Sequence, residues 1–177
     1  MTIYTIGHSD RPFPSFLRLL RAHGIELLVD VRRHPGSRKH PQYNREALAA
    51  ALAEAGIEYT FLGDTLGGRR ERSVPEEESP NRGLTHPSFR NYADYMRTPA
   101  FRRGVEDLLT LAADRKAAIM CSEGWWVTCH RRLLADALVA RGIEVRHIAS
   151  GVRADPHVID PAAVVTGKTV SYPPASE

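Results

Sequence analysis

The sequence has few cysteines and no long hydrophobic run. Its two cysteines, Cys121 and Cys129, stand close together in one segment, so they cannot form the spread-out disulfide framework of small secreted domains. No stretch approaches the roughly 18 apolar residues that a membrane-spanning helix needs, and MTIYTIGHSD lacks the pattern of an export signal. We therefore expect a cytoplasmic protein without a membrane partner, whose two thiols are either reactive, metal-binding or simply buried and inert.

An excess of charge is also absent. The net charge is only +3, so bulk electrostatics do not identify a nucleic-acid partner. Basic residues do cluster locally, in two runs that are ordinarily solvated loops. The runs comprise Arg32, Arg33, His34, Arg38, Lys39, His40 and Arg45, and then Arg69, Arg70 and Arg72.

Apolar periodicity predicts one α/β domain over residues 1–150, a length suited to a single hydrophobic core. Strands are expected at residues 3–8, 25–32, 57–62, 117–121 and 143–148, and helices at 14–23, 44–55, 89–97, 100–116 and 129–141. This alternation indicates a mainly parallel five-stranded sheet with helices on both faces. Residues 151–177 are expected to form a C-terminal tail or arm, with a small hairpin around Gly167 and Lys168.

Turn-forming and charged residues without an apolar period fill positions 63–86. This stretch predicts a long loop, more mobile than the sheet, that is either a lid or locally disordered. Two helix caps are also expected, at Asn44 and at Thr128.

Chemically active side chains stand where the predicted strands end. His8 ends the first strand, Asp30 and Arg32 the second, and Cys121 the fourth. Because ligands of open α/β sheets collect beyond the carboxyl ends of the strands, these residues and Cys129 should converge at one edge.

The segment from Cys121 to Arg131 carries the densest chemistry. A thiol at a helix start is readily ionised, so Cys129 should ionise before Cys121, and either could be a nucleophile. Glu123 or His130 could transfer protons, while Arg131 could bind an anion or pair with a carboxylate. We expect no cofactor and no metal. Zinc is the alternative, because two thiols, a carboxylate and an imidazole are all zinc ligands, but their spacing matches no paired Cys-x-x-Cys framework.

Flanking residues extend the anionic site. Asp30 is a candidate catalytic carboxylate or a partner of Arg32, and His8 with Arg32 could bind substrate. Small residues before Arg38 permit close backbone approach to a phosphate or carboxylate. Trp125 and Trp126 could stack on a planar substrate or pack on the domain.

Several segments in order resemble the family called domain of unknown function 488. They are TIGHS at residues 5–9, DVR and PGSR between 30 and 38, LGG at 66–68, YADYM at 92–96, and CSE with CHR between 121 and 131. The resemblance supports the fold and the site more than a reaction. A fainter likeness to rhodanese-type sulfurtransferases implies that Cys121 opens an anion-binding loop closed by Arg131, although the loop here is longer.

These observations favour a thiol-dependent enzyme, a transferase or hydrolase with a cysteine nucleophile, acting on a phosphate-bearing, nucleotide or nucleic-acid-derived substrate. Sulfur transfer is one version of this hypothesis. The alternatives are a non-catalytic nucleic-acid-binding module and a metal-binding or redox-sensing domain. Sequence alone leaves the substrate, the reactive thiol and the oligomeric state open.

Overall fold

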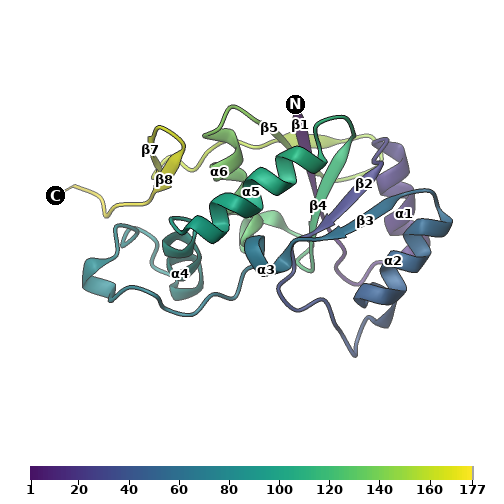
Figure 1. Cartoon of the computed structure of the whole chain (residues 1–177), viewed down its shortest axis with the longest axis horizontal. Coiled ribbons are helices and arrows are strands. Elements are labelled where there is room, and N and C mark those ends of the chain that lie inside the picture. Colours follow the sequence, from purple (N-terminus) through teal and green to yellow (C-terminus); the bar gives the residue numbers. More distant parts are fainter. Residues whose placement is uncertain (177) are drawn as a thin grey trace.

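The computed structural model describes residues 1–176 as an α/β fold with a central twisted sheet (Figure 1). Residue 177, the last position of the predicted tail, lies outside the described residues. The sheet has six strands in the order β3-β2-β4-β1-β5-β6. Their bounds are β1 Thr2–Gly7, β2 Leu27–Asp30, β3 Glu58–Phe61, β4 Ala117–Cys121, β5 Glu144–Ile148 and β6 Ala154–Pro156.

The parallel core of the sheet was predicted, but the strand number was wrong. All five predicted strands form and pair in parallel. The sixth strand, β6, comes from the predicted tail and pairs antiparallel with β5 at the sheet edge. Its three residues carry no apolar alternation, so no pattern in the sequence predicted a strand there.

Helices cover both faces of the sheet, as predicted. Helices α1 (Phe13–Ala22) and α2 (Arg45–Glu54) pack on one face, and α5 (Pro99–Leu111) and α6 (Arg131–Val139) pack on the other (Figure 1). The strands divide their side chains by the period of two that a pleated strand imposes. In β4, Ile119 faces the core beneath α6, whereas Met120 faces the core beneath α1 and α2. Both faces are therefore buried, which explains the nearly continuous apolar runs of these strands.

The chain leaves the two central parallel strands, β1 and β4, toward opposite sides of the sheet. After β1 the chain crosses through α1 to β2 on one side, and after β4 it crosses through α6 to β5 on the other. Strand β1 is also the strand between β4 and β5. A crevice opens at such a switch point, beyond the carboxyl ends of the two strands. His8 and Cys121 stand at those ends.

The stretch 63–86, predicted as a loop, contains a short helix α3 (Gly63–Leu66) and a 3₁₀ turn η2 (Glu76–Glu78). Besides the buried Leu66 and Leu84, it has polar anchors, which apolar periodicity does not reveal. Asn81 is fully buried and donates to Asp94 of α4 (Pro87–Tyr95) at 2.7 Å. Gly83 donates its N–H to the carbonyl of Tyr172, so the segment is also tied to the C-terminal hairpin.

The predicted hairpin is present as β7 (Val164–Thr166) and β8 (Thr169–Ser171), with Gly167 at a φ of 62° in the turn. It packs against the domain through Val170 and Tyr172, both buried in the core beneath α6. No helix among residues 1–176 is long and apolar enough to cross a membrane.

Both predicted helix caps differ in detail. Asn44 stands at the start of α2, but its side-chain oxygen accepts from the N–H of Ser37 in place of a helix N–H. The short 3₁₀ turn η1 (Pro41–Tyr43) precedes Asn44. Thr128 lies in another 3₁₀ turn, η3 (Trp126–Thr128), and α6 begins only at Arg131. Its hydroxyl donates to the carbonyl of Trp125, which stabilises η3 and delays the helix start.

Candidate functional site

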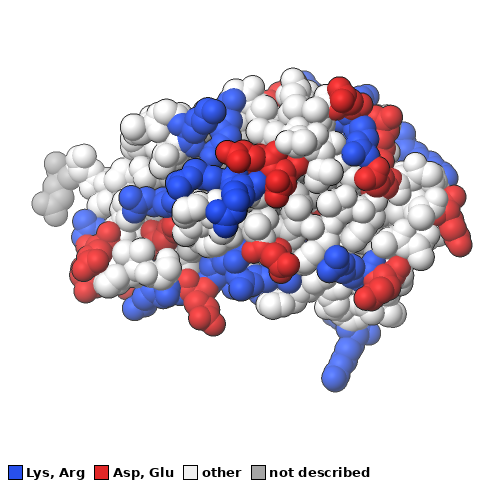
Figure 2. Space-filling view, in the orientation of Figure 1, with Lys and Arg blue, Asp and Glu red and all other residues white. Residues whose placement is uncertain are grey.

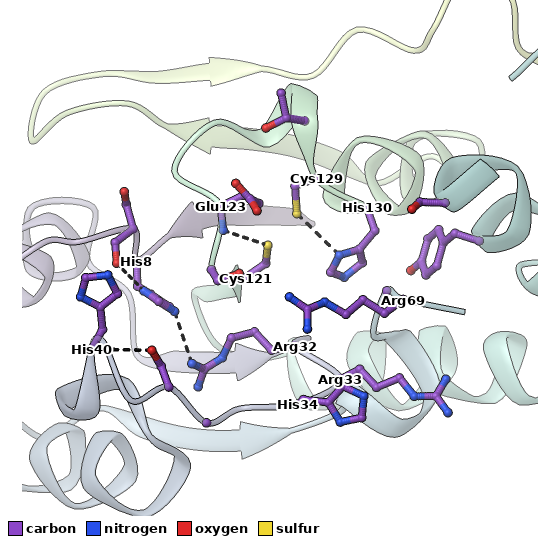
Figure 3. A pocket seen from close by; sticks show the side chains of 18 of the residues that line it. His8, Arg32, Arg33, His34, His40, Arg69, Cys121, Glu123, Cys129 and His130 are labelled. Carbon is purple, nitrogen blue, oxygen red and sulfur yellow. Dashed lines mark hydrogen bonds between the residues drawn. The ribbon is translucent and has the colours of Figure 1, made fainter. Parts of the chain in front are cut away.

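An open cleft of about 1070 Å³ lies beyond the carboxyl ends of β1, β2 and β4 (Figure 3). Its lining is strongly basic, with Asp10 and Glu123 as the only carboxylates among the described lining residues. The basic lining residues are His8, Arg32, Arg33, His34, Lys39, His40, Arg69, His86 and His130. Charge of this sign in a recess favours an anionic ligand.

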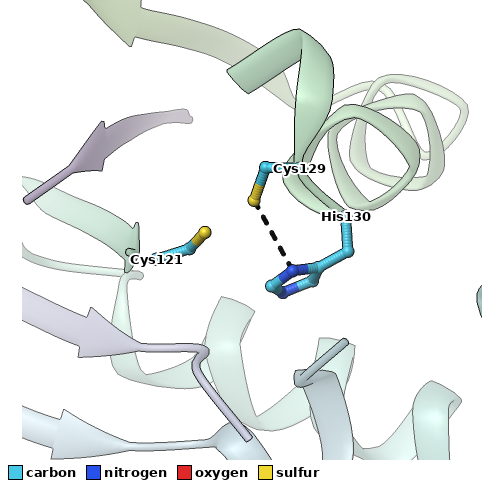
Figure 4. A group of neighbouring side chains, drawn as sticks. All are labelled: Cys121, Cys129 and His130. Atoms are coloured by element: carbon cyan, nitrogen blue, oxygen red, sulfur yellow. Dashed lines mark hydrogen bonds between the residues drawn. The ribbon is translucent and has the colours of Figure 1, made fainter. Parts of the chain in front are cut away.

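Two thiols lie in the floor of this cleft and face one another (Figure 4). Cys121 is the last residue of β4, and Cys129 precedes α6 by two residues. Each sulfur accepts a backbone N–H from two positions further on, Glu123 for Cys121 and Arg131 for Cys129, both at 3.4 Å. Neither thiol is in a disulfide, and both are more than nine-tenths buried.

The two thiols differ in acidity. Burial raises the pKa of Cys129, but hydrogen bonding from Cys121 and the charge and N–H groups of Arg131 outweigh it and bring the pKa down to about 7. The same hydrogen bond with Cys129, together with burial, raises the pKa of Cys121 well above its ordinary range. Cys129 is therefore the thiol that ionises first, in the order that the sequence predicted. Its partner holds the proton.

His130 stands between the thiols and the wall of the cleft. Its Nδ1 lies 3.6 Å from the Cys129 sulfur, and its Nε2 is buried without a hydrogen-bond partner among the described residues. Gly68 permits this position, because a Cβ there would lie 2.9 Å from the ring. Potential ligand atoms of Cys121, Cys129 and His130 lie within 4.8 Å of one another, so these three residues could hold a metal ion.

Arg131 lies behind the thiols and does not line the cleft. Its side chain is 1% exposed, and it donates to the carbonyl of Glu123 at 2.5 Å and to the hydroxyl of Thr5 at 3.3 Å. The turn that carries Glu123 lies directly on Gly7, where a Cβ would come within 1.8 Å of the Glu123 carbonyl oxygen. Arg131 thus supports the Cys129 sulfur from beneath and holds the turn after β4.

At the cleft wall, the guanidinium of Arg32 is held by an ion pair with Asp30. Its Nε and one terminal nitrogen donate to Asp30, the latter at 2.7 Å, while the other terminal nitrogen lies 3.3 Å from His8 Nε2. Asp30 is fully buried and also accepts from Tyr59 at 2.6 Å. Because this paired contact already fixes both side chains, they lose little additional freedom when a ligand binds.

His8 is neutral in this arrangement. Burial lowers its pKa to about 4, with the charge of Arg32 acting in the same direction. Its Nδ1 donates to the carbonyl of Ser9 at 2.7 Å, which leaves Nε2 as the acceptor facing Arg32. The ring also stacks on Tyr43 at 4.2 Å between centroids.

Five residues of the predicted site lie outside the cleft lining. Asp30 and Arg131 lie beneath it, where they orient other groups. Arg38 is exposed on the loop after β2, and Trp125 is 72% exposed, because each projects from a surface turn. Trp126 stacks on His147, with ring centroids 4.1 Å apart, so this face of its ring packs within the protein and is not free to stack on a substrate.

The sequence placed five other cleft residues only within basic runs. These are Arg33, His34, Lys39, His40 and Arg69. One backbone signal supports a functional role there. Among the described residues, Ser9 and Arg69 alone combine a side chain with a positive φ, 49° and 54°, and both line the cleft. Strain of this kind concentrates at ligand sites.

Fold and site together define an α/β protein whose switch-point cleft combines a thiol pair with a basic lining. The chain belongs to the family described as domain of unknown function DUF488, whose model matches residues 13–138. No curated protein and no solved structure matches the chain.

Proposed function

We propose that this protein is a thiol-dependent enzyme acting on an anionic substrate, with Cys129 as the nucleophile. The observation that carries the proposal is the position of the Cys129 sulfur in the floor of a cleft with a basic lining. Its lowered pKa, about 7, supports a thiolate at neutral pH. A thiolate of this kind needs no separate base to become nucleophilic.

The cleft supplies groups for a transfer reaction. Cys129 Sγ bonds the electrophilic phosphorus or sulfur of the substrate, and the bond from that atom to the leaving group breaks. Glu123 or His130, both lining the cleft, donates a proton to the leaving group when it needs one. Water or a second nucleophile then takes the transferred group and restores the thiolate, so no external oxidant or reductant is required.

Substrate binding falls to the guanidinium groups. Arg32, Arg33 and Arg69 all line the cleft, and Arg32 is held rigidly by Asp30. Guanidinium groups bind phosphate and related oxyanions through paired N–H donors. The cleft volume of about 1070 Å³ is at the upper end of ordinary ligand sites, which suits a nucleotide or a short nucleic-acid segment.

Two chromogenic reactions test the proposal directly. The protein is incubated with p-nitrophenyl phosphate for phosphoryl transfer, and with thiosulfate and cyanide for sulfur transfer. Turnover of either one, with a substrate-derived group on the Cys129 peptide in wild type and its loss in Cys129→Ser, supports the proposal. Arg38→Ala is the matched control, because Arg38 lies outside the cleft lining.

Other outcomes overturn it. Inorganic phosphate bound without any covalent adduct would favour a binding module. A stoichiometric metal, measured by elemental analysis of the purified protein, would assign Cys121, Cys129 and His130 to ligation. A surface-wide nucleic-acid-binding function has less support on the face seen in Figure 2, where basic and acidic side chains are interspersed.

A further inference from the structure

A buried row of hydrogen-bonded side chains runs from Arg131 away from the cleft. Arg131 donates to Thr5 Oγ1 at 3.3 Å, and Thr5 Oγ1 lies 2.6 Å from His147 Nδ1. His147 Nε2 lies 2.9 Å from His157 Nδ1, and His157 Nε2 lies 2.7 Å from Asp136 Oδ1. Every member is at least nine-tenths buried, and none lines the cleft.

The direction of each hydrogen bond follows from the carboxylate end of the row. A carboxylate only accepts, so His157 carries its proton on Nε2, and the neutral ring then accepts at Nδ1 from His147. His147 therefore carries its proton on Nε2 and accepts at Nδ1 from the Thr5 hydroxyl. A guanidinium only donates, so the Thr5 oxygen accepts from Arg131, which is compatible with this direction.

The row joins the buried guanidinium of Arg131 to a buried carboxylate, that of Asp136. No carboxylate among residues 1–176 forms an ion pair with this buried guanidinium. A buried charge without compensation is strongly destabilising. Asp136 is buried as well, and besides His157 it accepts from Tyr172 O–H at 2.7 Å and from Asp160 N–H at 3.1 Å.

We propose that Thr5, His147 and His157 form a neutral hydrogen-bond relay through which the carboxylate of Asp136 orients and balances the guanidinium of Arg131. His147 and His157 are accordingly positioning residues for Arg131. Their relation to catalysis rests on the proposed function, because Arg131 supports the Cys129 thiolate. The relay itself requires no substrate.

An added proton disrupts the relay. A doubly protonated His157 would point an N–H at His147 Nε2, so His147 would have to carry its proton on Nδ1 and donate to Thr5. The Thr5 hydroxyl would then receive two donors, and its own proton would lose the His147 acceptor.

The surroundings also oppose a positive charge on His147. Trp126 covers its ring face, Arg131 and His157 lie beside it, and only Asp155, which pairs with Arg153, is a favourable neighbour. Burial, with His157 and Arg131, lowers the pKa of His147 to about 3.

Residues beyond the family model contribute to the relay and to its carboxylate end. The family model ends at residue 138, whereas His147, His157 and Tyr172 all follow it. Strand β6 pairs with β5, and the residues after it supply both His157 and the Tyr172 hydroxyl to Asp136. This region therefore completes the support of the thiol site from behind.

Histidine NMR tests the relay in the wild-type protein. Two-bond ¹⁵N–¹H spectra of ¹⁵N-labelled protein distinguish the two neutral tautomers from the charged ring. We expect both rings to show the neutral tautomer with the proton on Nε2 at pH 7, as the bond directions of the relay require. For His147, whose pKa is lowered to about 3, this tautomer should persist down to pH 5.5. A proton on Nδ1 of either ring, or a charged ring at pH 7, overturns the proposal.

Alkylation of Cys129 tests whether the relay positions Arg131. In His157→Ala, the iodoacetamide rate at pH 7 should fall about fivefold, the change produced by a one-unit rise of a thiol pKa from about 7. His157→Gln should recover part of the rate, because an amide can accept at one end and donate at the other. Asp155→Asn, which removes a nearby carboxylate outside the relay, is the matched control.

The outcomes separate this inference from the proposed function. A folded His157→Ala with the wild-type alkylation profile overturns the positioning role even if the enzyme turns over. Absence of turnover with the expected NMR pattern and alkylation change overturns only the proposed function. If His157→Ala does not fold, His157→Gln and the wild-type spectra still decide the inference.

Discussion

The hydrogen bond between the two thiols gives the sharpest quantitative prediction. Cys121→Ala removes the S–H group that stabilises the Cys129 thiolate, while the N–H of Arg131 remains. A hydrogen bond to a charged group contributes about 1.5 kcal/mol at the lower end of its range, and one pKa unit corresponds to 1.36 kcal/mol. The pKa of Cys129 should therefore rise by about one unit from its wild-type value of about 7.

The assay is the rate of iodoacetamide modification of the Cys129 peptide between pH 5 and 10, read by mass spectrometry. Since the thiolate reacts, the rate rises with pH through the pKa and then levels off. In Cys121→Ala the whole curve should move to higher pH by about one unit. Cys121→Ser keeps a hydroxyl donor at the same position and should move it less.

Two results refute this reasoning. If Cys121→Ala leaves the Cys129 curve unchanged, the neighbouring thiol does not stabilise the anion. If Cys121 reacts at lower pH than Cys129 in the wild-type protein, the assignment of the two roles is reversed. Cys129→Ser identifies the signal of each thiol, because only the Cys121 peptide can then react.

The remaining predictions concern binding and stability. Arg32→Ala should abolish phosphate binding measured by calorimetry. It should also lower the free energy of unfolding by about 3 to 5 kcal/mol, because it leaves Asp30 buried without its charge partner. Arg38→Ala should change neither quantity, and normal phosphate binding by Arg32→Ala would exclude Arg32 as a ligand. Gly7→Ala should destabilise the protein in urea by at least about 1 to 3 kcal/mol, since its Cβ meets a carbonyl oxygen of the turn after β4, and wild-type stability would contradict that close approach. In the folded protein the pKa of His8 is about 4, below its ordinary value of 6.5. Between these two pH values the unfolded chain binds more protons than the folded one, so stability falls as the pH falls. In urea titrations, His8→Asn should reduce this dependence of stability on pH, and an unchanged dependence would show that His8 does not contribute.

The sequence determined most of the parallel sheet for a clear physical reason. A strand buried on both faces must be apolar throughout, and a helix must repeat its apolar residues with a period near 3.6. Strand β4 and helix α5 follow these rules closely, with Thr98 capping α5 through a bond to the N–H of Phe101. Strand β6 and the polar anchors of residues 63–86 follow neither rule, so no pattern announced them.

The candidate site divides in the same way. Because parallel strands end at a common edge, sequence order placed His8, Arg32 and Cys121 near one another, and the structure brings all three to one cleft. The sequence also indicated that Arg131 and Asp30 lie near the thiols. Whether a buried arginine contacts substrate or supports a neighbouring residue depends, however, on the direction of its side chain.

What the sequence by itself determined was the composition of the core and the edge of the sheet where reactive residues gather. The sequence also predicted that Cys129 ionises first, but only the tertiary structure supplied the hydrogen bond from Cys121, on another element, that helps to lower its pKa. Only it joined Thr5, Asp136 and His157, which are far apart along the chain and lack any local pattern. Local periodicity records how a segment is buried, whereas hydrogen bonds between distant segments exist only after the sheet has brought those segments together.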